Sequence, residues 1–206
     1  MKLVLFDLMD TVLVNPYYRV VSKLTPSHVT LHEFQSMRNM KSFLLFEKGE
    51  ISERDFYKNY YKADFDFKKA GFPDPRKLKK YLYKKMEAIP GMFEIIRNLN
   101  QREEVQTGIA SNYSIWYLEI FKKCRELETL FDYIFFSCEM GIRKPDSGFY
   151  RIIQESLENQ KYEKIIFIDD RKENVDSASE LGWNSFLFNE TAELKEFLSE
   201  STGFDY

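Results

Sequence analysis

Short apolar runs alternate along most of this chain with longer segments that carry apolar residues at helical spacing. Five runs have the length and composition of buried strands, and each ends in polar or charged residues: 3–6, 106–110, 133–137, 165–168 and 185–188. Between the later four, and after the last, apolar residues recur every three or four positions, as in amphipathic helices. Strands that alternate with helices of this length predict an α/β fold with a Rossmann-like, doubly wound parallel sheet.

The stretch from about residue 14 to residue 89 has a different pattern, without a convincing buried strand. Its tyrosine, phenylalanine and charged residues recur at helical spacing, and a Gly-Phe-Pro-Asp-Pro segment at 71–75 interrupts them. We therefore predict an α-helical cap domain, residues 14–89, inserted into a core of residues 1–13 and 90–206. Because the insert directly follows the first strand, we expect it to cover the strand ends as a lid.

Composition narrows the class of protein. The chain has 206 residues, 44% of them hydrophobic and 31% charged, with a net charge of −3 and interspersed signs, so no basic surface for nucleic acid is predicted. Cys124 and Cys138 are too few and too far apart for a disulfide framework, which indicates a reducing compartment. The apolar run 3–6 is too short for a signal peptide, and no run approaches a membrane span. We expect a cytoplasmic monomer or homodimer without nucleic-acid or membrane partners.

Two pairs of carboxylates follow two of the predicted strands. Asp7 and Asp10 come after the first strand, and Asp169 and Asp170 come after the fourth. In an open α/β sheet, ligands bind beyond the carboxyl ends of the strands, and converging carboxylates repel one another unless a cation lies between them. Such a hard oxygen site suits Mg²⁺. Considered alone, Asp10 is equally well explained as the cap of the next turn and Asp7 as an exposed strand end.

Zinc is a poor candidate for this site. The two histidines, His28 and His32, lie far from the predicted strands in the sequence, and the two cysteines do not have the spacing of a metal-binding motif.

Two more strand ends carry candidate phosphate ligands. Ser111 and Asn112 follow the second strand, where they either cap a helix that begins near Ser114 or bind a phosphate oxygen, and the two roles are compatible. Lys144 follows the next strand and precedes Pro145, which favours an extended backbone. A single lysine is most often a surface residue. At the same sheet edge as the carboxylates, its ammonium group would offset their charge and hold a phosphate.

The order of these motifs along the chain resembles that of the haloacid dehalogenase superfamily of aspartate-nucleophile hydrolases. The order is the first carboxylate pair, then Ser-Asn, then Lys-Pro and finally Asp-Asp. The resemblance covers the whole chain, and the insert matches the subfamily with a helical cap after the first strand. It implies that Asp7 is the nucleophile and a Mg²⁺ ligand, and that Ser111 binds phosphate with Asn112 beside it. It also implies that Lys144 stabilises the phosphoryl group and the nucleophile.

The main implied metal ligands match the family pattern, whereas the usual acid is absent from its position. The resemblance implies Asp170 as the main distal Mg²⁺ ligand, with Asp169 beside it, and the backbone carbonyl of Met9 as a further ligand. Phosphatases of the superfamily usually carry a second aspartate two residues after the nucleophile, as acid and base. Met9 occupies that position here, so either Asp10 takes the role or protons come from water or from the cap. Asn174 stands where many relatives have another aspartate.

Motifs in both the cap and the core are similar to a plant and bacterial branch that includes flavin mononucleotide (FMN) hydrolases: 6–11, 46–51, 111–117, 143–146 and 167–171. The branch implies a Mg²⁺-dependent phosphatase that hydrolyses a small-molecule phosphate monoester, with FMN as a candidate, through an aspartyl-phosphate. A 2-haloacid dehalogenase is an alternative, favoured by the missing acid at position 9 and disfavoured by the Asp-Asp pair. A phosphomutase, and a non-catalytic relative that binds phosphate and metal, are further alternatives.

Overall fold

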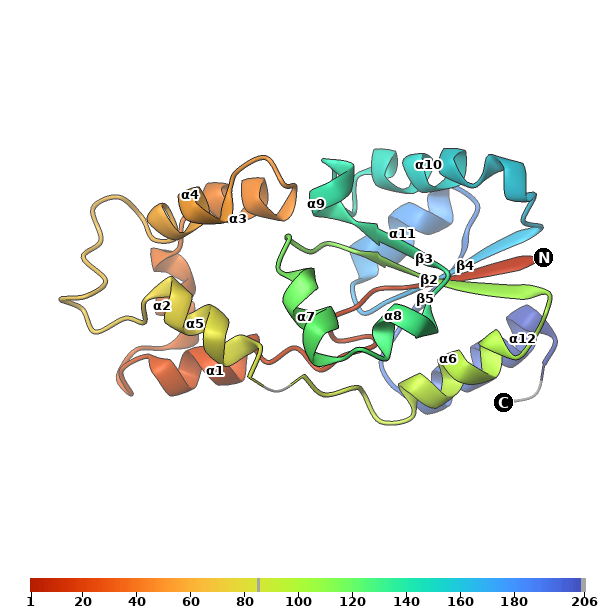
Figure 1. Cartoon of the computed structure of the whole chain (residues 1–206), viewed down its shortest axis with the longest axis horizontal. Helices are drawn as coiled ribbons and strands as arrows, with labels where there is room; N and C mark the ends of the chain where they lie inside the picture. The colour runs from red at the N-terminus through yellow and green to blue at the C-terminus, as the bar shows by residue number, and fades with distance from the viewer. Residues whose placement is uncertain (85, 205–206) are drawn as a thin grey trace.

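The computed structural model describes residues 1–84 and 86–204. Its core is a parallel sheet of five strands in the order β3-β2-β1-β4-β5 (Figure 1). The strands are β1 (Lys2–Phe6), β2 (Val105–Ser111), β3 (Tyr133–Phe136), β4 (Lys164–Asp169) and β5 (Asn184–Leu187). Each overlaps one of the five predicted runs, so the predicted α/β fold with a parallel sheet is confirmed.

The central strand β1 is buried because helices cover both faces of the sheet. Val4 and Phe6 belong to one apolar cluster, and Leu3 and Leu5 to a second cluster across the sheet, as the alternation of side chains along a strand requires. The helices that flank the sheet are α6 (Met92–Asn100), α7 (Tyr117–Lys123), α8 (Leu127–Leu130), α9 (Ser137–Met140), α10 (Ser147–Ser156), α11 (Lys172–Glu180) and α12 (Thr191–Thr202), with a 3-10 helix η1 (Glu158–Gln160). No helix among the described residues is both long enough and apolar enough to cross a bilayer.

The segment between β1 and α6 forms a separate helical lobe, at the left of Figure 1. It contains α1 (Tyr17–Leu24), α2 (Leu31–Met37), α3 (Met40–Glu47), α4 (Glu53–Lys58) and α5 (Pro75–Leu82). The chain leaves and re-enters the core through two paired segments, in which the Val14 amide donates to the Glu87 carbonyl and the Ile89 amide donates to the Val12 carbonyl, both at 2.9 Å. The predicted cap limits, 14 and 89, fall within this crossing.

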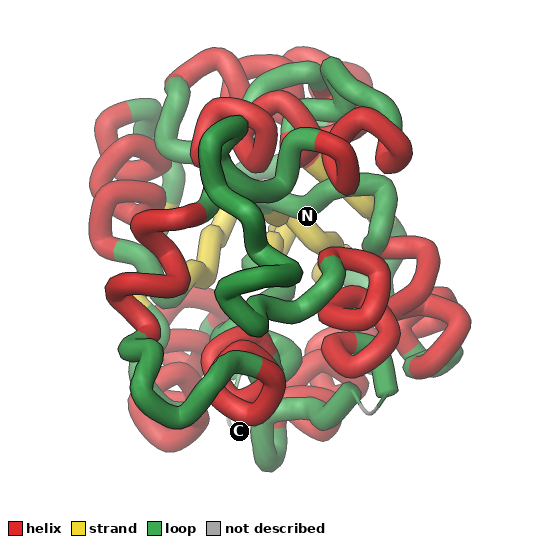
Figure 2. The backbone as a smooth tube through the Cα atoms, turned by 90° about the vertical axis from the view of Figure 1, so that its left-hand side faces the viewer, coloured by secondary structure: helices red, strands yellow, loops and turns green. Residues whose placement is uncertain are grey.

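Short helices of six to eight residues make up this lobe, so packing rather than helix length stabilises it. Aromatic rings fill its interior. Phe46 and Phe56 stack with their centroids 4.3 Å apart, and Trp116 from the core meets both rings edge-on at 5.4 and 5.5 Å. Seen from the side of the lobe in Figure 2, its helices and loops lie in front of the strands. The lobe therefore faces the carboxyl ends of the strands, through contacts that include Trp116.

A close backbone contact fixes one end of the lobe against the core. Gly49 has a φ of 72°, and a Cβ atom added there would lie 2.1 Å from the carbonyl oxygen of Cys138. Only glycine permits both this conformation and this approach. Beside it, the Ser137 hydroxyl donates to the Glu47 carbonyl at 2.6 Å. The C-terminal end of α3 is thereby held over the sheet edge.

Candidate active site

The first strand delivers Asp7 to the sheet edge between two neighbours. β1 pairs with β4 in a register that sets Phe6 opposite Ile168, and the Asp7 amide continues the ladder by donating to the Ile168 carbonyl at 2.8 Å. Asp7 therefore lies beside Asp169, the last residue of β4. On the other side β2 ends at Ser111. The strand ends thus bring together residues that are more than 160 positions apart in the sequence.

A cavity of about 550 Å³ opens between this edge and the helical lobe, which is within the usual range of small-molecule sites, about 300–1,000 Å³. The predicted site residues that line it are Asp7, Met9, Asp10, Ser111, Asn112 and Asp170. Its walls on the lobe side are largely aromatic, and they include Phe43, Phe46 and Tyr60. The structure therefore gathers six of the eight predicted residues around one cavity, and the other two, Lys144 and Asp169, do not line it.

Lys144 is buried beneath the cavity, with 1% of its surface exposed. Its Nζ donates three hydrogen bonds of 2.6 Å, to Asp7 Oδ1, to Asp169 Oδ2 and to the Ala110 carbonyl. Burial alone would lower the pKa of Lys144, but Asp169 and Asp7 outweigh it and raise the pKa above its usual value. Lys144 is therefore a permanent cation that holds Asp7 in place.

The electrostatic state of Asp7 depends on this lysine. Burial raises the pKa of Asp7 to about 7, and the negative charges of Asp169 and Asp170 add to the rise, whereas Lys144 opposes it. A cation placed in the cavity would favour the ionised carboxylate further. A cation bound in the cavity next to Asp7 would thus lower its pKa and increase the ionised fraction of the carboxylate.

Asp169 supports Lys144 rather than facing the cavity. Its two oxygens accept hydrogen bonds from Asn174 Nδ2 at 2.9 and 3.0 Å and from the Arg171 amide at 2.9 Å, in addition to Lys144. Asp169 is fully buried. Because its oxygens accept hydrogen bonds from protein donors, Asp169 does not line the cavity, and its role as a metal ligand stays a prediction. Asn174 acts here as a neutral donor to Asp169.

The loop after β1 presents Asp10 and Met9 to the cavity. Asp10 has a left-handed backbone, with φ 59°, and its Oδ1 accepts a hydrogen bond from the Asn15 amide at 3.1 Å. The turn-capping role considered for Asp10 is thus present, alongside an exposed position on the cavity wall. Burial, followed by the charges of Asp169 and Asp10, raises the pKa of Asp170 to about 6. The carboxylates of this edge are therefore close enough to repel one another.

Asn112 secures the backbone of the lysine loop. Its Oδ1 accepts from the Lys144 amide and its Nδ2 donates to the Lys144 carbonyl, both at 2.8 Å. The interpretation of Ser111 and Asn112 as a helix cap is not observed, because α7 begins at Tyr117 and its N-cap is Trp116. The Asn112 side chain therefore positions the lysine loop, and Ser111 lies buried at the cavity wall.

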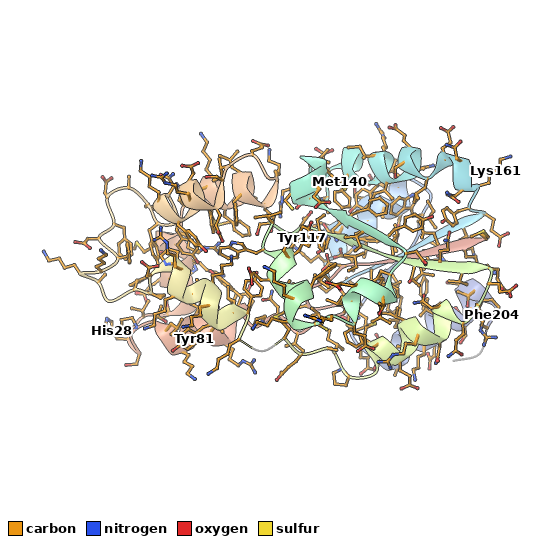
Figure 3. The ribbon with its side chains drawn as sticks, in the orientation of Figure 1. His28, Tyr81, Tyr117, Met140, Lys161 and Phe204 are labelled. Atoms are coloured by element: carbon orange, nitrogen blue, oxygen red, sulfur yellow. The ribbon has the colours of Figure 1, made fainter. Side chains whose placement is uncertain are left out.

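The oxygen donors of this edge fit a Mg²⁺ ion. The described residues contain no cluster of three or more histidine, cysteine, aspartate or glutamate side chains arranged to hold a metal. Mg²⁺ does not need one, because it is usually bound by one or two carboxylates together with carbonyls, waters and a substrate phosphate. Asp7, Met9 and Asp170 line the cavity wall, where two carboxylates and a backbone carbonyl would provide such a set. His28 lies at the far end of the helical lobe in Figure 3, so it is not near this site.

Several cavity residues were not identified from the sequence as site residues. Arg143 forms an ion pair of 2.6 Å with the buried Glu47 of the lobe, next to the Lys144 loop. Both lie within the motifs that resemble the FMN hydrolase branch, which was the available signal. Arg38 and Tyr60 also line the cavity, and no motif or spacing distinguishes them from other polar and aromatic residues of the insert.

Comparison with known proteins assigns the family. Residues 4–188 match the model of haloacid dehalogenase-like hydrolases. The chain belongs to this hydrolase family. It is 30% identical over 200 residues to the chloroplastic flavin mononucleotide hydrolase 1 of Arabidopsis thaliana, an alignment that covers 97% of this chain and 77% of the relative. The family resemblance inferred from the strand-end motifs is thus confirmed.

Solved structures of the haloacid dehalogenase family share the fold. A predicted family hydrolase from Porphyromonas gingivalis superposes with a TM-score of 0.70 at 21% identity and covers 96% of this chain and 98% of its own. A family enzyme from Bacteroides thetaiotaomicron, in complex with magnesium and inorganic phosphate, superposes with a TM-score of 0.69 at 17% identity, over 94% and 98% of the two chains. At these identities the likeness establishes the fold, both core and helical lobe.

Proposed function

We propose that this hydrolase is a Mg²⁺-dependent phosphatase that cleaves a small-molecule phosphate monoester through an aspartyl-phosphate on Asp7, with FMN as the candidate substrate. The observation that carries the proposal is the position of Asp7, on the wall of the cavity and fixed from behind by Lys144 at 2.6 Å. The relative named as a flavin mononucleotide hydrolase and the family structure that contains magnesium and phosphate support it.

In the proposed first step, an Asp7 carboxylate oxygen attacks phosphorus in line, and the bond from phosphorus to the leaving oxygen breaks. Asp10 donates a proton to that oxygen, so the alcohol leaves neutral. In the second step Asp10 takes a proton from water as the water attacks the phosphorus, which releases inorganic phosphate and restores Asp7. Ser111 donates to a phosphoryl oxygen, while Lys144 and Asn112 keep the nucleophile aligned.

The metal is expected at the oxygen donors described above. Asp7, Asp170 and the Met9 carbonyl would hold Mg²⁺, which supplies positive charge that neutralises the phosphate. Asp169 holds Lys144 in this scheme and is not assigned as a direct ligand.

Hydrolysis should require Mg²⁺, because Asp7 and Asp170 would otherwise repel the phosphate dianion. We expect phosphate release from FMN and from other monoesters in Mg²⁺, and a loss of at least about 100-fold in excess EDTA, restored by added Mg²⁺. The measurement is inorganic phosphate release over a panel of esters. Full activity in EDTA would contradict the metal requirement, and halide release from 2-haloacids without phosphatase activity would instead support a dehalogenase.

Replacement of Asp10 by asparagine should slow esters with poor leaving groups more than esters with good ones. General acid catalysis typically contributes about 10²–10⁴-fold, and a nitrophenolate leaving group needs little of it. We therefore expect the loss of kcat/KM to be at least about tenfold larger for an alkyl phosphate than for p-nitrophenyl phosphate. Equal losses on both would mean that Asp10 acts only through its hydrogen bond with the Asn15 amide.

A further inference from the structure

An arginine of the helical lobe is buried in the cavity wall among aromatic rings. Arg38 is 9% exposed, and its guanidinium carbon lies 4.7 Å from the ring centroid of Phe43 and 5.2 Å from those of Tyr17 and Tyr60. All four residues line the cavity that also contains Asp7. The negative faces of aromatic rings stabilise an enclosed guanidinium electrostatically, but its N–H groups still require hydrogen-bond acceptors.

The described part of the chain supplies these acceptors only in part. Arg38 takes part in none of its ion pairs, and Arg38 Nε is buried without a hydrogen-bond partner. The hydroxyls of Tyr17 and Tyr60 are likewise buried and lack a hydrogen bond of good geometry. They lie near each other and near Arg38, whose charge lowers both pKa values against the larger effect of burial. One unpaired donor and two poorly bonded hydroxyls on one wall cost free energy in the unliganded protein, and a ligand with well-placed acceptors would recover it.

The nearby carboxylate does not serve as the missing partner. Glu47 lines the same cavity, but its carboxylate is bound to Arg143, through Nε at 2.8 Å and a terminal nitrogen at 2.6 Å. Arg38 forms no ion pair with Glu47 in the structure, so its donors are open to an acceptor on a ligand.

The backbone around Arg38 is fixed before any ligand arrives. Arg38 forms an isolated antiparallel bridge with Tyr61. On either side, the Asn39 amide donates to the Tyr60 carbonyl and the Lys62 amide donates to the Met37 carbonyl, both at 2.9 Å. These bonds set Arg38 opposite Tyr61 and Asn39 opposite Tyr60, so a ligand would not have to order this backbone, which favours affinity.

We propose that Arg38, Tyr17 and Tyr60 form the recognition site for the leaving group, and that this site selects a flat heterocycle whose edge carries carbonyl acceptors. The proposal rests on the proposed function, which puts the phosphate at the Asp7 end of the same cavity. The guanidinium and the two hydroxyls donate to the carbonyl edge, while the half-buried Phe43 packs against the ring system. The ring system of a flavin has this chemistry, whereas a sugar or an alkyl chain does not.

Binding of riboflavin tests the site without any catalytic step. Riboflavin carries the ring but not the phosphate, so its affinity, measured by the change in its fluorescence, reports this end of the cavity alone. We expect Arg38→Met to weaken binding by roughly 10- to 100-fold, the usual effect of losing a charged hydrogen-bond donor. Arg76→Met is the matched control, because Arg76 also lies over a tyrosine of the lobe, Tyr57 at 4.9 Å, but is exposed and outside the cavity.

The hydroxyl variants Tyr17→Phe and Tyr60→Phe keep the ring packing and remove only the donor, so they decide the question if Arg38→Met does not fold. Each should weaken riboflavin binding by about three- to tenfold. No riboflavin binding by the wild type, or the same affinity in the wild type and in the folded Arg38 and tyrosine variants, would overturn the proposal.

Kinetics separates this proposal from the proposed function. Phenyl phosphate presents a flat ring without carbonyl acceptors, so Arg38→Met should lower kcat/KM for FMN at least about tenfold more than for phenyl phosphate. Equal losses on both esters would overturn the recognition site while leaving the phosphatase intact. If the wild type hydrolyses no phosphate ester but binds riboflavin through Arg38, the proposed function fails and the recognition site stands.

Discussion

Replacement of Asp7 by asparagine is expected to abolish hydrolysis of phosphate esters and to leave the fold intact. The amide has the size of the carboxylate but cannot form the covalent intermediate, and loss of a catalytic nucleophile costs roughly 10⁴-fold or more in kcat. The fold should survive because the substitution removes one of the two negative charges bound to Lys144 and leaves a neutral pair, Lys144 with Asp169. Phosphate release and thermal unfolding, measured on the same preparation, check both expectations.

Asp176→Asn provides the matched control for this experiment. Asp176 is an exposed aspartate whose contact is an ion pair with Lys172 on α11, and it does not line the cavity. It should retain wild-type activity. Activity of the Asp7 variant within tenfold of the wild type would remove Asp7 from the mechanism, as would a phosphorylated intermediate trapped on another residue by acid quench.

The fold could be predicted because its signals are local. The apolar runs before Asp7 and Asp169 have the composition of strands buried on both faces, and their alternation with helical segments favours a parallel sheet covered by helices. A parallel sheet in turn places all its strand ends at one edge, so the grouping of Asp7, Ser111 and Asp170 followed from topology. The helical insertion was visible because its segment lacks any such run.

What each side chain contacts could not be predicted, because it depends on packing between distant segments. Asp169 and Asp170 are neighbours in the sequence, yet one is enclosed by protein donors and the other lines the cavity. Asn112 lies beside Ser111, yet it holds the lysine loop 32 positions away. In the sequence, Arg38 looks like any other charged residue of an amphipathic segment, and only the packing of the lobe buries it. The cytoplasmic location, the monomeric or dimeric state and the absence of nucleic-acid and membrane partners stay predictions from composition.

The substitution Lys144→Met should have the second large effect, on stability as well as on activity. It leaves Asp7 and Asp169 together at the base of the cavity without their cation, and removal of one partner from a buried ion pair typically costs about 3–5 kcal/mol. Lys144 opposes the rise in the pKa of Asp7 that burial causes, so its removal leaves less of the carboxylate ionised to act as nucleophile. We expect urea unfolding to show the loss of stability, and phosphate release to fall by at least about 10²-fold.

The double variant Lys144→Met/Asp169→Asn distinguishes the two roles of the lysine. Asp169 is fully buried, so making it neutral removes the charge that has no access to solvent, whereas Asp7 keeps its access to the cavity. Much of the lost stability should return. Recovery should be incomplete, because the Ala110 carbonyl still lacks the donor that Lys144 supplied. Activity should not return, because no cation then holds Asp7 from behind.

If the free energy of unfolding of Lys144→Met lies within about 1 kcal/mol of the wild-type value, the burial of the unpaired carboxylates costs less than their geometry implies. If the double variant regains activity, Lys144 serves only to neutralise Asp169.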